Sequence, residues 1–146
     1  MSDLVCSCFR LRRAARRVTN AYDRALAPIG ITAVQFTVLA EIARNSGLSV
    51  AALGDRLATE RTAMSRVVKP LLQAGLVEDG PGDDARARHL RLTEMGLERL
   101  HAGSKAWLKV EGRLTRLLGV IERDTLWAML SATEDAMEAI ETPSSA

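Results

Sequence analysis

Residues 59–71 read TERTAMSRVVKPL, and they predict a helix that runs on to Ala74. On a helical wheel the apolar side chains gather on one side, where they must pack against a neighbouring element. The opposite side is polar but carries no Glu, the commonest residue on a helix face that only keeps a protein in solution. The apolar side comprises Met64, Val67, Val68 and Leu71, and the polar side comprises Thr62, Ser65, Arg66, Lys69 and Gln73, with Arg61 on its flank.

This polar side matches the chemistry that reads base edges in a DNA major groove. Thr62 and Ser65 supply short hydroxyl groups near the start of the helix, and Arg66 supplies a guanidinium that can bond O6 and N7 of guanine. Lys69 lies further along, where an outer cation contacts phosphate. The alternative is an ordinary solvated face. The missing Glu, and the hairpin predicted after the helix, favour DNA recognition.

The segments before this helix predict a helix-turn-helix. A helix over residues 32–45 begins with Thr32 and Gln35, whose spacing is that of a capping box. A short helix over 49–58 follows, and the polar helix over 59–74 comes directly after it. Two short helices joined by few residues, the second with an exposed polar face, describe a helix-turn-helix.

A β-hairpin is predicted next, with short strands at residues 76–78 and 89–92. The loop between them, GPGDDARAR, carries Arg86 and Arg88 at its tip, where Arg side chains can enter a narrow minor groove. Asp84 stands two residues before Arg86, so an ion pair within the loop can aim the guanidinium. A merely solvated hairpin tip is equally consistent with the loop taken alone.

Long amphipathic helices are predicted at both ends of the chain, over residues 4–26, 93–119 and 123–141. Their apolar stripes are wider than one small lobe can cover, so they need a partner surface. We therefore expect a homodimer; the alternative is a monomer in which these helices pack on one another.

The predicted fold class is mainly α: a winged helix-turn-helix with a small β-hairpin wing and long N- and C-terminal dimerisation helices. We assign residues 31–95 to the DNA-binding lobe, and residues 3–30 plus 96–141 to the dimerisation region, in a single intertwined domain.

Composition argues against several other classes of protein. The 146 residues carry a net charge of only +2, whereas a non-specific architectural DNA-binding protein needs a far more basic chain.

The sequence contains no Gly-rich phosphate loop and no nucleophile elbow. His89 and His101 lack metal-ligand spacing to the two cysteines. We therefore expect no enzyme, cofactor or metal site. No apolar run reaches the roughly 20 residues of a membrane helix, and no signal-peptide pattern is present, so we expect a cytoplasmic protein without a membrane partner.

The order of these elements resembles the MarR family of bacterial transcription regulators. The resemblance rests on TERTAMSRVVKPLLQAGLV (59–77), on Asp84-Ala85-Arg86 and on LRLTEMG (90–96), and it covers nearly the whole chain. It implies a homodimer, usually a repressor, whose terminal helices form the dimer. Each winged lobe would then bind half of a palindrome in double-stranded DNA.

The resemblance also implies roles for individual residues. The positions matching Arg61, Thr62, Ser65 and Arg66 approach bases and phosphates in that family, and those matching Asp84 and Arg86 hold and insert the wing. Pro70 departs from many members. Because proline removes a helical hydrogen bond, a kink at this position would change the reach of Lys69.

Two release signals are compatible with the resemblance. The commoner family mode is a small anionic, often aromatic, ligand bound between the dimer helices and the winged lobe. The alternative is a redox switch, because Cys8-Phe9 followed by Tyr22 is similar to the peroxide-sensing branch, although a further tyrosine of that branch falls near Ala33 here. Cys8 lies on the apolar stripe and Cys6 lies off it, so we expect Cys8 to be buried and inert.

Overall fold

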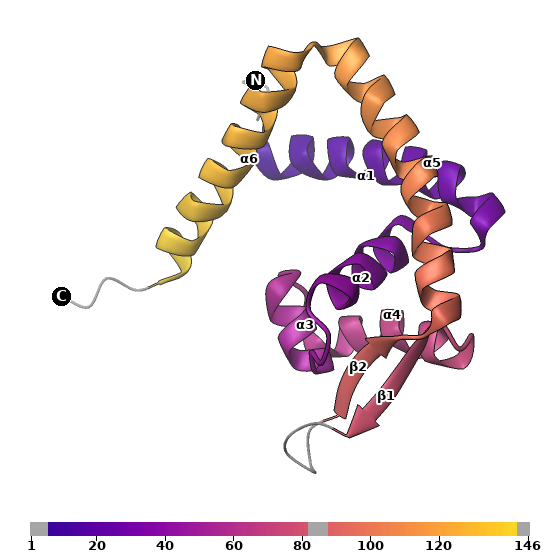
Figure 1. Cartoon of the computed structure of the whole chain (residues 1–146). Helices are drawn as coiled ribbons and strands as arrows, with labels where there is room; N and C mark the ends of the chain where they lie inside the picture. The colour runs from indigo at the N-terminus through magenta and orange to yellow at the C-terminus, as the bar shows by residue number, and fades with distance from the viewer. Residues whose placement is uncertain (1–5, 82–87, 143–146) are drawn as a thin grey trace. The chain divides into compact units, whose positions relative to one another are not determined.

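The computed structural model describes residues 6–81 and 88–142, which are mainly α-helical with one two-stranded hairpin (Figure 1). The predicted fold class is confirmed. The elements are α1 (Ser7–Leu26), the 3-10 turn η1 (Ala27–Ile29), α2 (Ala33–Arg44), α3 (Val50–Arg56), α4 (Arg61–Gln73), β1 (Val77–Pro81), β2 (Arg88–Leu92), α5 (Glu94–Leu118) and α6 (Val120–Glu141).

The chain divides into two structural units, Met1–Leu108 and Lys109–Ala146. The first unit contains α1 to β2 and the first part of α5, and the second contains the remainder of α5 and all of α6. Within the first unit, Figure 1 shows the β1–β2 hairpin projecting beyond the helices α2, α3 and α4.

Helix α2 begins where three hydrogen bonds satisfy its first backbone N–H groups. The Thr32 hydroxyl accepts from the Gln35 amide at 3.2 Å, and the Gln35 side chain accepts from the Thr32 amide at 2.9 Å, which confirms the predicted capping box. The Asp23 carboxylate of α1 accepts a third bond from the Ala33 amide at 2.7 Å. This last contact ties the end of α1 to the start of α2.

The core of the first unit forms around α2, which contacts α1, α3, α4 and β2. Its most deeply buried side chains come from all of these layers, and each contributes about 1.5–3 kcal/mol by leaving water. The shared core therefore sets the position of α4 against α2 and α3. The large side chains exposed by less than 2% are Leu26, Val38, Leu39, Ile42, Leu53, Met64, Val68, Leu71 and Leu90.

An aromatic stack joins three helices of the first unit. The Trp107 ring of α5 lies between Tyr22 of α1, at 4.0 Å between ring centroids, and Phe36 of α2, at 4.7 Å. Gly103 permits this approach, because an added Cβ there would lie 2.8 Å from the Phe36 ring. The chain has only two Trp, one Tyr and two Phe, so the stack uses three of its five aromatic residues.

The start of α5 is fixed to the end of α4. The Thr93 hydroxyl donates to the carbonyl of Gly75 at 2.6 Å and accepts from the Gly96 amide at 3.0 Å, and the Thr93 amide donates to the Leu76 carbonyl. Gly96 is buried against that same Leu76 carbonyl. These contacts join the last turn of α4 directly to the first turn of α5.

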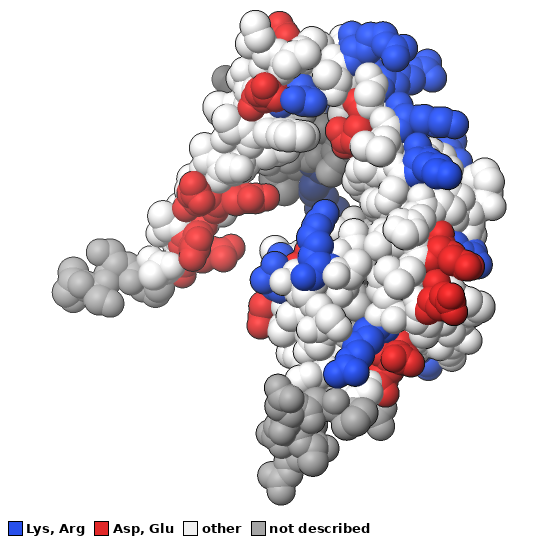
Figure 2. All heavy atoms as spheres, viewed as in Figure 1, with Lys and Arg blue, Asp and Glu red and all other residues white. Residues whose placement is uncertain are grey.

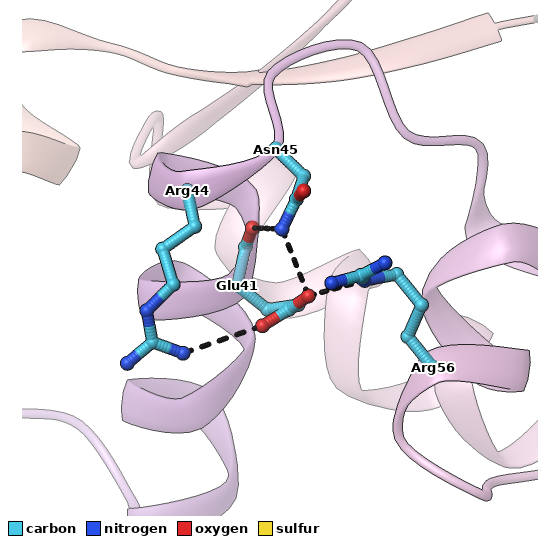
Figure 3. A network of polar contacts seen from close by, with 4 residues as sticks. All are labelled: Glu41, Arg44, Asn45 and Arg56. Atoms are coloured by element: carbon cyan, nitrogen blue, oxygen red, sulfur yellow. Dashed lines mark hydrogen bonds and ion pairs between the residues drawn. The ribbon is translucent and has the colours of Figure 1, made fainter.

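Glu41 is the one buried charged residue described, with 8% of its surface exposed. Its carboxylate accepts hydrogen bonds from Arg56 Nε, from Asn45 Nδ2 at 2.9 Å and from Arg44 Nη1 at 3.4 Å (Figure 3). Arg56 is the last residue of α3, so this network connects the C-terminal ends of α2 and α3. It complements the apolar packing by fixing the orientation of α3.

The strands are longer than the sequence predicted. β1 pairs with β2 in antiparallel register from Val77↔Leu92 to Pro81↔Arg88, so residues 80 and 81 belong to a strand and not to the loop. Leu48, before α3, forms an additional bridge with Leu90: the Leu90 amide donates to the Leu48 carbonyl at 2.9 Å, and the Gly47 amide donates to the Leu90 carbonyl at 3.1 Å. A single bridging residue has no periodic pattern that sequence inspection could find.

Within the described ranges, no single helix is long and apolar enough to cross a membrane. Ser7–Ile29 and Ala33–Arg44, which meet at a bend of 76°, have the length and apolar composition of a membrane span only when they are taken together. Helices buried in a protein core can have the same length and composition.

We predict that Gly96→Ala destabilises the fold, whereas Gly112→Ala on the same helix does not. A Cβ at residue 96 would collide with the Leu76 carbonyl, and displacing that backbone should cost about 1–3 kcal/mol. At residue 112 no described atom lies within 4 Å of the added Cβ, and alanine favours a helix by about 1 kcal/mol over glycine. Urea unfolding followed by circular dichroism measures both variants. Equal stabilities would contradict the close junction between α4 and α5.

We predict that Glu41→Gln destabilises the fold near neutral pH and has little effect in acid. The hydrogen bond from Arg56 holds the pKa of Glu41 below its ordinary value of 4.5, although burial opposes this. A carboxylate with a lowered folded-state pKa stabilises the fold above its unfolded-state pKa, and the stabilisation is lost as pH falls through the folded-state pKa.

The difference in unfolding free energy between wild type and Glu41→Gln should be about 1–2 kcal/mol near neutral pH, because both arginines are at least half exposed. Urea titrations at decreasing pH should show this difference closing below about pH 4.5. A difference that stays constant with pH would contradict the charged network.

Candidate nucleic-acid interface

The polar side of α4 faces solvent along the whole helix. Met64, Val68 and Leu71 are each 1% exposed and anchor the opposite side in the core, while Val67 is half-buried. The predicted arrangement of buried and exposed sides is therefore observed. The exposed set comprises Arg61, Thr62, Ser65, Arg66, Lys69 and Gln73.

A close turn over residues 57–60 sets the start of α4. The Thr59 amide donates to the Gly54 carbonyl at 2.8 Å, and a Cβ at Gly54 would lie only 2.6 Å from the Thr59 carbonyl oxygen. Ala58 adopts a left-handed φ of 46°, which ends α3 at Arg56, two residues earlier than predicted.

The prediction that Thr59 begins the polar helix is wrong. Its hydroxyl donates to the Leu57 carbonyl at 2.9 Å, and Glu60 is the N-cap residue. In the described structure no side chain caps α4, so its first backbone amides face outward beside Arg61 and Thr62. These amides add donors to the same end of the helix as the hydroxyl groups.

Pro70 lies within α4 without ending it. The helix continues to Gln73, and the Ala74 amide donates to the Pro70 carbonyl at 2.9 Å. The proline is exposed, and the Lys69 side chain remains on the exposed side of one continuous helix.

The wing residues fall in two places relative to the described structure. Arg88 begins β2 opposite Pro81, so its predicted position at the tip of the loop is corrected to the first residue of strand β2, directly after the loop. Strand pairing continues further than the alternation of apolar residues indicated. Asp84 and Arg86 lie outside the described residues.

Both cysteines are exposed thiols. Cys6 is the N-cap residue of α1, and Cys8 lies in the first turn. The expectation that Cys8 is buried is wrong for the single chain, because α1 contributes buried side chains to the core only from Tyr22 onward. The two cysteines line a shallow hollow of about 510 Å³ together with Phe9, Arg12, Arg13 and Arg16.

An open hollow of about 400 Å³ lies between α2 and the first part of α5, beside the aromatic stack. Phe36 and Trp107 line it, together with the guanidinium-bearing Arg44 and with His101. The sequence did not indicate this hollow, because its walls come from residues more than fifty positions apart. The remaining lining residues are Ala40, Ala43, Leu100, Ser104 and Leu108.

Over residues 6–81 and 88–142, no group of three or more His, Cys, Asp or Glu side chains is arranged to hold a metal ion. The exposed side of α4 combines hydroxyl, guanidinium and ammonium groups.

Sequence comparison finds the same family that the motifs resemble. The MarR family profile matches residues 29–87. A relative from Thauera aromatica, described as a "putative transcriptional regulatory protein for hcr operon", is 30% identical over 124 residues, which cover 84% of this chain and 75% of that protein.

Solved structures agree over nearly the whole chain. The M. tuberculosis transcriptional regulator MosR, in complex with DNA, is 34% identical with a TM-score of 0.79, and the match covers 94% of this chain and 99% of that one. The transcriptional repressor CouR, bound to a 23-mer DNA duplex, is 30% identical with a TM-score of 0.82, covering 88% and 92%. CouR bound to p-coumaroyl-CoA matches at 28% identity and a TM-score of 0.82, covering 88% and 91%.

These relatives are transcriptional regulators rather than enzymes. MosR and CouR share the fold of this chain over the matched length, with TM-scores of 0.79 and 0.82. The chain belongs to the MarR family of winged helix-turn-helix, DNA-binding transcriptional regulators.

Proposed function

We propose that this protein is a transcriptional repressor that binds a pseudo-palindromic operator as a homodimer and is released by a small-molecule ligand. The observation that carries the proposal is the exposed side of α4, where bases and phosphates can be contacted and no carboxylate repels them. Residues 31–95 form the DNA-binding lobe, and residues 3–30 plus 96–141 form the dimerisation region. Because its target is chromosomal DNA, we place the protein in the cytoplasm.

In this proposal α4 enters the major groove with its N-terminal turns toward the bases. Thr62, Ser65 and Arg66 contact base edges, while Arg61 and Lys69 contact phosphates on either side. The uncapped amides at the start of α4 favour a phosphate at that end. MosR and CouR, both bound to DNA in their solved structures, support the assignment.

The wing contacts the adjacent minor groove. In this proposal Asp84 orients Arg86 within the loop, and Arg88, the first residue of β2, adds a positive charge to the wing. An Arg side chain is favoured where A·T-rich sequence narrows the minor groove and strengthens its negative potential.

A second copy of the chain covers the apolar side chains of the second unit. Leu117, Ile121 and Ile140 are 75%, 78% and 73% exposed, and Trp127 is 53% exposed. This much exposed apolar surface marks an interface. Two-fold symmetry would then present two α4 helices to successive major grooves on one face of the duplex.

The ligand that we propose is a small aromatic anion bound in the hollow between α2 and α5. Phe36 and Trp107 offer ring surfaces for an aromatic group. The Arg44 side chain is 73% exposed and makes only a long contact of 3.4 Å with Glu41, so its guanidinium can also bind an anionic group. CouR bound to p-coumaroyl-CoA supports an aromatic ligand. Such a ligand releases DNA only if it binds more tightly to a lobe spacing that no longer matches the operator.

The alternative release signal is oxidation of Cys8. Two observations favour it: the thiol is exposed, and Arg12, Arg13 and Arg16 line the same hollow. Reactive cysteines typically combine exposure with nearby positive charge. An organic hydroperoxide would oxidise the Cys8 thiolate to a sulfenic acid and itself be reduced to an alcohol.

We predict that Arg66→Ala and Ser65→Ala lower specificity, whereas Lys69→Ala lowers affinity for all sequences. Each lost base contact should cost about 1–3 kcal/mol on the operator and little on random DNA. Loss of Lys69 should weaken both duplexes and reduce the salt dependence by about one phosphate contact. Fluorescence anisotropy at several salt concentrations measures these effects on operator and random duplexes.

Lys105→Ala is the control for these variants, because it removes an exposed cation from α5 and not from α4. It should leave operator specificity unchanged. Equal losses on operator and random DNA for Arg66→Ala would show that this side chain contacts phosphate instead of a base. Wild-type binding by all α4 variants would refute the proposed interface.

We predict that dilute organic hydroperoxide does not release the protein from its operator, because in our proposal a small-molecule ligand releases it. In a gel-shift titration with the peroxide, the wild type, Cys6→Ser and Cys8→Ser should all stay bound. An aromatic carboxylate or its CoA thioester should release the wild type, and Arg44→Ala should weaken this response. Release of the wild type by hydroperoxide, with retention by Cys8→Ser, would establish the redox alternative instead.

A further inference from the structure

The start of α1 brings two thiols to the same hollow. Cys6 and Cys8 are both exposed, and both line the hollow of about 510 Å³ described above. Two positions within one helix lie about 200° apart around its axis, so helical side chains at this spacing face opposite sides. Cys6 instead precedes the helix as its N-cap residue, with an extended backbone. The Cα atoms of the two cysteines lie no more than about 7 Å apart, so both sulfur atoms can reach one small ion.

Both thiols are available to a ligand. Each is a free thiol, and the Cys6 side chain forms no capping hydrogen bond at the start of α1. The contact that Cys6 does make there comes from its backbone, because its carbonyl accepts a hydrogen bond from the Arg10 amide at 3.1 Å. Binding at the two sulfur atoms therefore leaves the first turn of α1 intact.

The surroundings of the two thiols are positively charged. No Asp or Glu occurs between residues 6 and 22. Arg12, Arg13 and Arg16 line the hollow, and the Arg13 guanidinium lies 5.7 Å from the centre of the Phe9 ring. The N-terminal end of α1 adds partial positive charge, and its first turn contains no acidic residue. Figure 2 colours the Lys and Arg side chains blue and the Asp and Glu side chains red. The hollow therefore suits a complex of negative charge.

The lining of the hollow selects among metal ions. Among the described residues that form it, two sulfur atoms are present and no carboxylate or imidazole. Mg²⁺ and Ca²⁺ need oxygen ligands, and structural Zn²⁺ needs four ligands. Over the described ranges, no group of three or more His, Cys, Asp or Glu side chains could hold such an ion. Cu(I) prefers soft thiolate ligands and forms stable complexes with only two of them.

We propose that Cys6 and Cys8 of one chain bind a single Cu(I) ion. Two thiolates and Cu(I) carry a net charge of −1, which the three arginines that line the hollow stabilise. The expectation from the sequence that no metal site exists concerned His and Cys at the spacing of larger sites, which a two-coordinate ion does not need. Both thiols and all three arginines belong to one end of one chain, so the site needs neither the operator nor the ligand proposed above. It shares no lining residue with the hollow between α2 and α5.

Cu(I) enters this site by ligand exchange. The donor is an anionic complex of Cu(I) with two low-molecular-weight thiolates, which the arginines attract. Each cysteine sulfur replaces one thiolate, so two S–Cu bonds form and two break. The two cysteine protons pass to the departing thiolates, which leave as thiols. Copper remains Cu(I), and the charge of the complex remains −1.

Titration of the reduced, full-length protein with Cu(I) tests the site, in the absence of oxygen and in competition with a coloured Cu(I) chelator. We expect one Cu(I) per chain, with two sulfur ligands in X-ray absorption spectra. Cys6→Ser and Cys8→Ser should each weaken binding by more than the roughly 10–100-fold that follows loss of a residue behind a ligand, because each removes a ligand itself. The chain has no other cysteine, so the double variant provides the baseline without thiols.

Two pairs of arginines on α1 separate the effect of the hollow from that of general charge. Arg12→Gln/Arg16→Gln removes two charges that line the site, whereas Arg10→Gln/Arg17→Gln removes two charges from the same helix that line a different hollow. The first pair should weaken Cu(I) binding about tenfold. The second should have little effect at physiological ionic strength, where charges separated by more than about 8 Å are screened.

Three results would overturn the proposed site. One is wild-type affinity for Cu(I) in either single cysteine variant. Another is one Cu(I) per two chains, which would place the ion between copies of the protein. The third is equal weakening by the two arginine pairs, which would leave the hollow without a specific role. Circular dichroism checks that each variant is folded, and operator binding through α4 is measured separately from all three results.

Discussion

The stack of Tyr22, Trp107 and Phe36 packs α1, α2 and α5 of the first unit against one another. Its ring separations of 4.0 and 4.7 Å require close approach of α5 to α2, which Gly103 permits. Phe36 also belongs to α2, the helix against which α3, α4 and β2 pack. The stack therefore connects α1 and α5 to the core that positions the exposed polar side of α4.

The recognition helix is held at both ends by backbone contacts. At its start the turn over residues 57–60 closes on Gly54, and at its end the Gly75-Leu76 carbonyls bond to Thr93 at the beginning of α5. These contacts join the end of α4 directly to the start of α5. In the proposed mechanism, a ligand beside Trp107 would shift α4 through α5 only if it binds one arrangement of the two helices more tightly than the other.

Local sequence patterns predicted most of the fold, and the structural features that they did not predict have a common physical origin. The Thr32–Gln35 capping box and the two sides of α4 could be predicted because each depends on residues within one or two helical turns. The Glu41 network, the aromatic stack and the hollow could not, because their members meet only through tertiary packing. Cys8 lies on an apolar stripe, yet periodicity does not say whether the same chain covers that stripe. The length of the strands, and with it the position of Arg88, depended on cross-strand pairing that extends beyond the apolar alternation.

The central claim is that two copies of α4 read successive major grooves on one face of the operator. Guanine N7 methylation interference tests it most directly, because N7 lies in the major groove. We expect two patches of interference, one in each half-site, with centres about 10 bp apart on the same face of the duplex. A single patch, or binding that is indifferent to N7 methylation throughout the operator, would contradict it.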